Sequence, residues 1–149
     1  MMDREQGIIK INYQKETEKI LTDIKQNGRK PKLVLQSCCG PCSSYVLQYL
    51  TDYFDVYVYY YNPNIFPQQE YVHRLNTQKQ LIESLPHENK IELLPTEYNH
   101  DEFLKASKGL EHEKEGGARC EKCFLLRLEE TAKKARQLGA DYFGTTLTV

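Results

Sequence analysis

Short apolar segments alternate with amphipathic segments along this chain of 149 residues. This alternation predicts strands at 32–37, 54–61, 91–94 and 141–149, and helices at 13–27, 43–50, 69–85, 100–107 and 120–138. Ser43 or Ser44 is expected to cap the second helix. Strands separated by helices at this spacing favour a mostly parallel sheet with helices on both faces. The predicted fold class is therefore a three-layer α/β domain.

The chain is long enough for one domain with a core, and 40% of its residues are hydrophobic. We predict a helical extension over residues 1–30 and a single α/β domain over residues 31–149. No apolar run has the length of a signal peptide or a membrane span, so we expect a cytoplasmic protein with no membrane partner. The net charge of −1 excludes a global attraction for nucleic acid.

All five cysteines lie in two tight groups: Cys38, Cys39 and Cys42 in the first, and Cys120 and Cys123 in the second. Thiols stay reduced in the cytoplasm, which favours metal binding or redox catalysis over structural disulfides. Four thiolates are enough for a zinc ion or an iron–sulfur cluster. The fifth thiol remains for another task.

Ligands of parallel α/β sheets bind beyond the carboxyl ends of the strands. The first cysteine group follows the first predicted strand, Asn62 and Asn64 follow the second, and Thr145 and Thr146 approach the end of the fourth. We expect the helix that carries Cys120 to begin near the opposite edge or in the long loop before it. The glycine-containing loop 108–119 would then have to fold over to join the two cysteine groups.

Two alternatives remain open for the cysteines. Cys39-Gly-Pro-Cys42 has the spacing of a thioredoxin-like dithiol placed between a strand and a helix. Cys38 and the second cysteine pair have no part in that chemistry. A structural zinc site would use four thiols and leave one over, and the interval 43–119 is longer than in a zinc ribbon.

The chain resembles the QueH-type epoxyqueuosine reductases from about Asn12 to its last residue. The resemblance is carried by Ser37-Cys-Cys-Gly-Pro-Cys-Ser-Ser-Tyr-Val46, Tyr60-Tyr-Asn-Pro-Asn-Ile65, Glu70-Tyr71 with Arg74, Gly109-Leu-Glu111, Gly116-Gly-Ala-Arg-Cys-Glu-Lys-Cys-Phe124, Arg127-Leu128, Thr131-Ala132 and Asp141-Tyr-Phe-Gly-Thr-Thr-Leu-Thr148. Each block alone is a weak signal, whereas the combination is specific.

The resemblance implies a nucleotide α-hydrolase-like (HUP-type) sheet and the reduction of epoxyqueuosine to queuosine at the wobble position of tRNA, the last step in making that base. It implies a [4Fe–4S] cluster held by Cys38, Cys39, Cys120 and Cys123. It also implies an adjacent mononuclear iron that involves Cys42, the expected catalytic residue, where some members have an acidic residue. The partners would be tRNA carrying epoxyqueuosine and an external electron donor.

Further polar and aromatic side chains are expected to contact the substrate: Tyr61, Asn62, Asn64, Arg74, Arg119, Thr145 and Thr146. Strand tyrosines are also commonly buried, and surface arginines commonly form ion pairs. Arg127 lies one turn after Cys123 and could contact phosphate or donate to a cluster sulfur.

The family continues beyond the position of Val149, so we expect this chain to be either truncated within its fourth strand or naturally short. The ATP-dependent tRNA thiolases share the implied fold type and can bind iron–sulfur clusters. They need a glycine-rich phosphate loop, and Cys-Cys-Gly-Pro-Cys has too few glycines for one. A non-catalytic RNA-binding module would not explain five clustered thiols.

Overall fold

The computed structural model describes residues 12–38, 40–85 and 90–146, and only the backbone for residues 40–42. The elements follow one another as α1 (Tyr13–Gln26), β1 (Lys32–Gln36), α2 (Gly40–Leu50), β2 (Asp55–Tyr59), α3 (Gln68–Ser84), β3 (Ile91–Leu94), α4 (His100–Ala106), α5 (Ala118–Leu138) and β4 (Tyr142–Thr145). Within the described ranges, no helix has both the length and the apolar character needed to cross a membrane.

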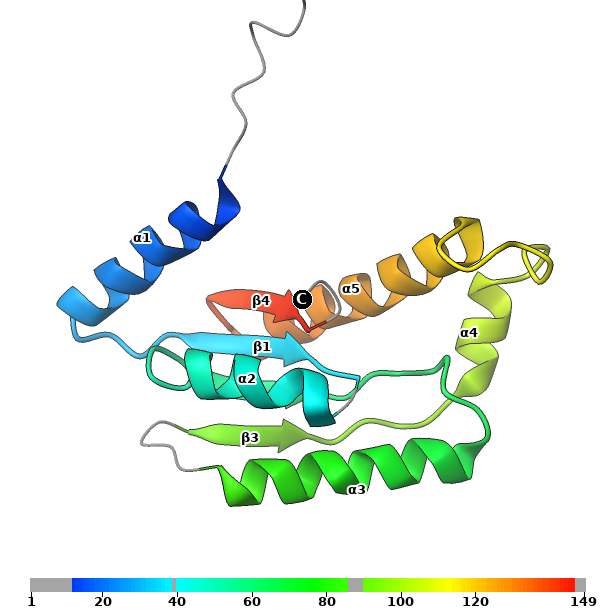
Figure 1. Cartoon of the computed structure of the whole chain (residues 1–149), viewed down its shortest axis with the longest axis horizontal. Coiled ribbons are helices and arrows are strands. Elements are labelled where there is room, and N and C mark those ends of the chain that lie inside the picture. Colours follow the sequence, from blue (N-terminus) through cyan, green and yellow to red (C-terminus); the bar gives the residue numbers. More distant parts are fainter. Residues whose placement is uncertain (1–11, 39, 86–89, 147–149) are drawn as a thin grey trace, which may run out of the picture.

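The four strands form one parallel sheet in the order β3-β2-β1-β4 (Figure 1). In this register Gln36, the last residue of β1, lies beside Tyr59 of β2 and Thr145 of β4. The carboxyl ends of the three strands therefore meet at one edge of the sheet. The chain segments that follow them are brought together there.

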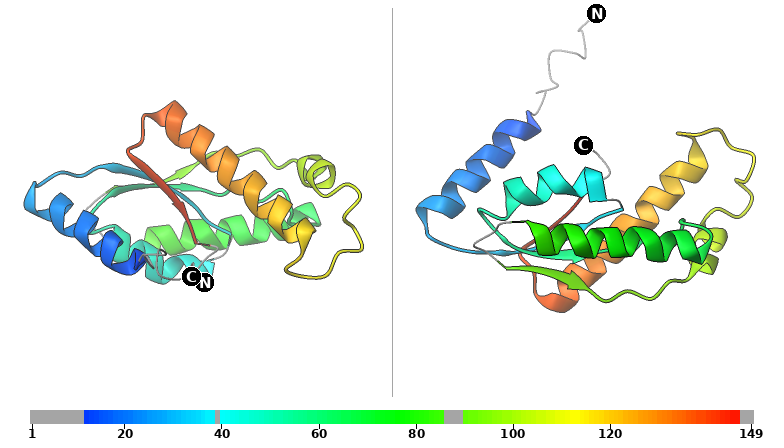
Figure 2. Two further views of the ribbon diagram at one scale, coloured as in Figure 1. Left: turned by 90° about the horizontal axis from the view of Figure 1, so that it is seen from above. Right: turned by 60° about the horizontal axis from the view of Figure 1, so that its bottom comes forward.

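Helices cover both faces of the sheet, which confirms the predicted three-layer α/β class (Figure 2). α1, α2 and α3 lie over one face, where the core includes Leu21, Leu33, Leu47 and Val58. α5 crosses the other face over a second set of buried side chains, namely Val34, Tyr59, Tyr61, Leu94 and Ala135. Residues that alternate along β1 and β2 thus serve opposite faces, as the pleat of a strand requires. The HUP-type assignment is compatible with this arrangement.

The boundaries of two helices differ from the sequence prediction. α2 begins at Gly40, three residues earlier than expected, because a proline in the first turn of a helix has no N–H to leave unpaired. Ser43 is therefore a buried residue inside the helix and does not cap it. α5 begins at Ala118, so that Cys120 and Cys123 both lie in its first two turns.

Candidate functional site

The first cysteine group lies directly beyond the carboxyl end of β1. Cys38 is partly buried two residues after the last residue of the strand. The backbone of Cys42 belongs to the first turn of α2, whereas its side chain and the whole of Cys39 lie outside the described residues. The structure thus places Cys38 and the backbone of Cys42 at the expected edge of the sheet.

The second cysteine group lies at the same edge, and our expectation that its helix begins near the opposite edge was wrong. A helix that leads into a parallel strand runs antiparallel to that strand, so it starts at the edge where the strands end. α5 has this direction before β4, as Figure 1 shows. Loop 108–117 therefore joins α4 to α5 without having to bring Cys120 and Cys123 across the sheet.

A cavity of about 420 Å³ opens beside the second cysteine pair. It is lined by Asn64, which follows β2, by Phe103 of α4, and by Arg119, Cys120, Cys123 and Arg127 of α5. Three separate segments thus place two thiols, two guanidinium groups and one amide around a single volume.

A buried polar network joins the middle of α5 to the turn after β1. Arg127 Nη1 donates to Asn62 Oδ1 at 3.3 Å, and Gln36 Nε2 donates to the same oxygen at 3.0 Å. Asn62 Nδ2 donates to the Ser37 carbonyl at 2.7 Å, directly before Cys38 in the chain. One asparagine, 1% exposed, therefore links the arginine of the second cysteine pair to the backbone of the first group.

A second set of buried polar side chains supports the cysteine turn from the side of α3. The hydroxyl groups of Ser37 and Ser43, which flank the turn, are in hydrogen-bond contact with each other. Ser37 Oγ also donates to Gln78 Oε1 at 3.3 Å, and all three residues are fully buried. These contacts hold the two ends of the turn together.

The two thiols of α5 differ in their surroundings. Burial raises the pKa of the Cys123 thiol, and this effect outweighs the charge and hydrogen bond of Arg127, which favour the thiolate. Cys120 is only partly buried, and its sulfur accepts a hydrogen bond from the Gly116 N–H at 3.3 Å. Cationic side chains and a helix N-terminus therefore surround the pair with groups that stabilise negative charge.

The structure brings only some of the predicted substrate residues to the cavity. Asn64 and Arg119 line it, and Arg119 Nη1 also donates to the Glu111 carbonyl at 3.3 Å. Arg74 belongs to α3, the helix that lies on the opposite face of the sheet from α5, and it is paired with Glu70 at 2.8 Å. The hydrogen bond with Glu70 is the main cause that raises the pKa of Arg74, and the charge of a Cys38 thiolate is the smallest of the contributions.

The remaining predicted residues are tied into the protein itself. Tyr61 is buried, and its hydroxyl donates to a carboxylate oxygen of Glu102. Thr145 Oγ1 donates to Gln36 Oε1 at 2.9 Å, which extends the Asn62 network to β4. Thr146 is buried and bonds through its backbone N–H to the Gln36 carbonyl at 3.0 Å.

Several buried polar atoms at this edge lack a hydrogen-bond partner among the described residues. They are Arg127 Nε, Asn64 Oδ1, Gln78 Nε2 and Thr146 Oγ1. Within that part of the chain, no three His, Cys, Asp or Glu side chains form a group that could hold a metal ion. The unpaired donors of Arg127 and Gln78, together with the thiols of Cys120 and Cys123, nevertheless fit an anionic, sulfur-rich group bound at this edge.

Sequence reasoning did not assign Gln36, Gln78, Glu102 or Phe103 to the site. For two of these residues, the sequence contains a pattern that could have identified them. Gln36 is a polar residue at the end of an otherwise apolar strand, and Gln78 is a polar residue between the apolar positions Leu75 and Leu81 of α3. Glu102 and Phe103 had none, because their role depends on where α4 packs.

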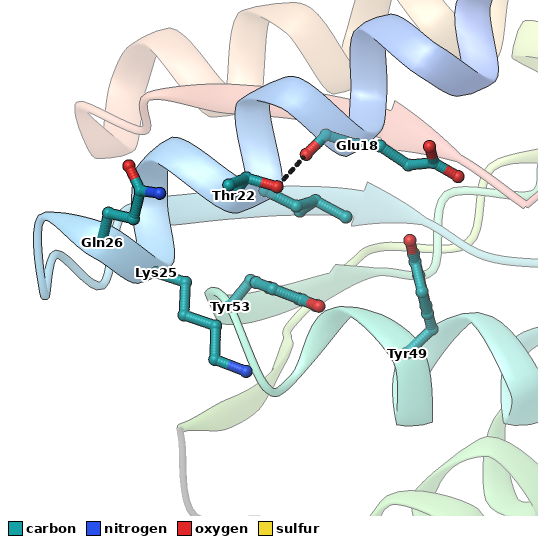
Figure 3. Close-up of a pocket in the computed structure, with 7 residues that line it drawn as sticks. Glu18, Thr22, Lys25, Gln26, Tyr49 and Tyr53 are labelled. Carbon is teal, nitrogen blue, oxygen red and sulfur yellow. Dashed lines mark hydrogen bonds between the residues drawn. The ribbon is translucent and has the colours of Figure 1, made fainter.

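A larger cavity, of about 510 Å³, lies between α1 and α2, away from the cysteines (Figure 3). Glu18, Thr22, Lys25 and Gln26 line it from α1, opposite Tyr49 and Tyr53. Thr22 Oγ1 donates to the Glu18 carbonyl at 2.8 Å. The cavity contains no thiol, so it does not provide the chemistry expected of the cysteine groups.

Comparison with known proteins identifies the family. The family model described as "Epoxyqueuosine reductase QueH" matches residues 33–149, which include both cysteine groups. Proteins named Epoxyqueuosine reductase QueH are 42% identical in Staphylococcus epidermidis, 40% in Staphylococcus aureus and 38% in Streptococcus pyogenes, in each case over 94% of this chain. The matches cover 60%, 60% and 56% of those relatives, so the chain spans about three fifths of their length. The chain therefore belongs to the QueH family.

Proposed function

We propose that this protein is an oxidoreductase that reduces epoxyqueuosine to queuosine at the wobble position of tRNA. The observation that carries the proposal is the family match over residues 33–149, which spans every cysteine of the chain. The grouping of two thiols, two arginines and one asparagine around a cavity at the carboxyl edge supports it. The activity belongs in the cytoplasm, where thiols stay reduced.

The proposed cofactors are a [4Fe–4S] cluster and an adjacent iron. Cys38, Cys39, Cys120 and Cys123 would hold the cluster, and Cys42 would help to hold the iron. When bound, these groups supply single electrons and Lewis acidity. Converting an epoxide to an alkene consumes two electrons and two protons and releases the oxygen as water, so an external electron donor is needed.

The protein's own side chains have three tasks in this proposal. Asn64 and Arg119, which line the cavity, would orient the base, and Arg74 of α3 would contact the RNA backbone. The buried network of Gln36, Asn62 and Thr145 would keep the carboxyl edge rigid. Tyr61 and Glu102 would hold α4 and its Phe103 against the cavity.

The test is purification of the full-length protein without oxygen, followed by iron and sulfide analysis. At least four iron per chain with acid-labile sulfide is expected. Serine at Cys38, Cys39, Cys120 or Cys123 should remove most of the cluster, whereas Ser44→Ala, a small change beside the first cysteine group, should not. Stoichiometric zinc without sulfide, after reconstitution with iron and sulfide, would exclude the cluster.

The activity is tested in a cell that lacks its own reductase, by mass spectrometry of its tRNA nucleosides. Production of the cluster-loaded, full-length protein should convert epoxyqueuosine to queuosine. Persistent epoxyqueuosine despite a loaded cluster would exclude this substrate.

A second candidate function is thiol–disulfide exchange. One observation favours it: α2 begins directly after Cys39, which is the placement that a Cys-Gly-Pro-Cys dithiol has at the start of a helix. It leaves Cys38 and the cavity at the start of α5 without a role. Substitution of Cys42, discussed below, distinguishes the two functions.

A further inference from the structure

Arg127 is the residue through which the two cysteine groups are connected. It lies four residues after Cys123, so both side chains project from the same face of α5. Thr131 and Ala135 follow on the same face of α5 at the same spacing, and both are buried against the sheet. Arg127 is therefore held on the inner face of the helix, next to the carboxyl ends of the strands.

Among the described residues, the guanidinium group finds acceptors for only some of its N–H groups. Nη1 donates to Asn62 Oδ1, and the backbone carbonyl of Arg127 accepts from Thr131 Oγ1 at 2.6 Å. Nε is buried, yet no acceptor for it is found in the described ranges 12–38, 40–85 and 90–146. A buried guanidinium N–H without a partner destabilises a protein, so an acceptor is expected to occupy this place.

The chemistry of the surroundings indicates the acceptor. Arg127 lines the same cavity as Cys120 and Cys123, so its guanidinium group lies beside the two thiols that the proposed function assigns to the cluster. A four-iron cluster with four thiolate ligands carries a net negative charge, and its sulfur atoms accept hydrogen bonds. Arg119, the other arginine of the cavity, lies at the start of α5 and already donates to the Glu111 carbonyl.

We propose that Arg127 is a positioning residue for the cluster: it braces α5 against the turn after β1 through Asn62, and its remaining N–H donates to a cluster sulfur. This inference rests on the proposed function, since it requires the cluster. The brace keeps the distance between the two cysteine groups constant. The positive charge stabilises the reduced form of the cluster, which carries one more negative charge than the oxidised form.

Three variants of the full-length, anaerobically reconstituted protein test the proposal. Arg127→Gln removes the charge, Arg127→Lys keeps the charge but loses the forked geometry, and Asn62→Ala removes the anchor. Arg136→Gln is the matched control, because Arg136 lies on the same helix but is exposed near its other end. The readouts are the rate at which a chelator removes iron and the midpoint potential of the cluster.

All three variants should lose iron to the chelator about 10-fold faster than the parent protein, as expected when a ligand's supporting partner is removed. Arg127→Gln should also lower the midpoint potential, whereas Arg127→Lys and Asn62→Ala should leave it near that of the parent. Arg136→Gln should change neither readout. If Arg127→Gln retains no cluster at all, the other two variants decide. Faster iron loss in Arg127→Lys and Asn62→Ala supports the brace, whereas iron loss at the rate of the parent protein in both variants overturns the proposal.

Other outcomes contradict the proposal in distinguishable ways. An unchanged potential and chelation rate in Arg127→Gln, with a raised KM for tRNA, would mean that Arg127 contacts the RNA instead. If Arg136→Gln lowered the midpoint potential as much as Arg127→Gln, the effect would come from the net charge of the protein and not from the position of Arg127. If the parent protein takes up neither iron nor sulfide, the proposed function fails together with this inference.

Discussion

Arg127 of α5 donates to Asn62, which follows β2 and lies 65 residues earlier in the chain. This contact connects the helix that carries the second cysteine pair to the loop beside the first group. Asn62 in turn donates to the carbonyl group of Ser37, directly before Cys38. The buried amide of Asn62 therefore links α5 to the backbone next to Cys38, and the proposed site shared by both cysteine groups would depend on it.

We expect Asn62→Ala to lower the free energy of unfolding of the metal-free protein by about 1–3 kcal/mol, because it removes the acceptor of Arg127 Nη1 and leaves the Ser37 carbonyl with only a 3.5 Å contact from Gln36 Nε2. Urea unfolding measures the change. Asn76→Ala, an exposed asparagine of α3, is the control and should stay within about 0.5 kcal/mol of the parent. Equal stabilities of the two variants would show that the network contributes nothing.

Substitution of Cys42 separates the metal role from the dithiol role. If Cys42 helps to hold the adjacent iron, Cys42→Ser should remove about one iron per chain, keep the four-iron cluster and lower activity. Cys42→Asp should retain more activity than Cys42→Ser, because a carboxylate can also bind iron. Iron analysis and substrate turnover measure both effects. Unchanged iron content with equal loss of activity in both variants would favour the dithiol.

Tyr59 should make the protein less stable in alkali. Burial, with a smaller effect of the Glu130 and Glu102 charges, raises the pKa of Tyr59 to about 12, compared with about 10 in an unfolded chain. The folded state therefore keeps a proton that the unfolded state loses, and the stability that this provides is full below about pH 10 and lost as the pH rises towards 12.

The expected loss from Tyr59 between pH 9 and pH 11 is on the order of 1 kcal/mol. Tyr59→Phe should lack this part of the pH dependence, as measured by urea unfolding at both pH values. Tyr45→Phe, at a tyrosine that is 70% exposed, should follow the parent protein. If the free energy of unfolding changed equally between pH 9 and pH 11 in all three proteins, Tyr59 would not be the source of the pH dependence.

Leu47 should contribute strongly to the packing that holds α2, and with it the cysteine turn, on the sheet. Its side chain is completely buried among residues of α1, β1 and β2. Leu47→Ala should therefore cost about 2–5 kcal/mol of unfolding free energy. The control Leu104→Ala removes a side chain that is 51% exposed and should cost far less. Thermal unfolding of both variants measures the loss of stability. Comparable losses in the two variants would contradict the packing role of Leu47.

The sequence alone determined the local elements and the chemistry. The apolar runs predicted all four strands to within a few residues, since buried parallel strands need continuous hydrophobic side chains. Gly28 and Gly139 marked the ends of α1 and α5, because both have the positive φ that other residues avoid. The spacing of Cys38, Cys39, Cys42, Cys120 and Cys123 was enough to predict one shared sulfur site, which remains a prediction.

Only the tertiary structure decided which side chains meet. The edge at which α5 begins follows from the direction of a helix between parallel strands, and of the two positions expected from the sequence, the opposite edge was wrong. The contacts of Gln36 with Thr145 and of Arg127 with Asn62 depend on the β1–β4 register and on how α5 crosses the sheet. Such contacts join residues far apart in the chain, so no local pattern encodes them. Their geometry exists only once hydrophobic burial has stacked the helices on the sheet.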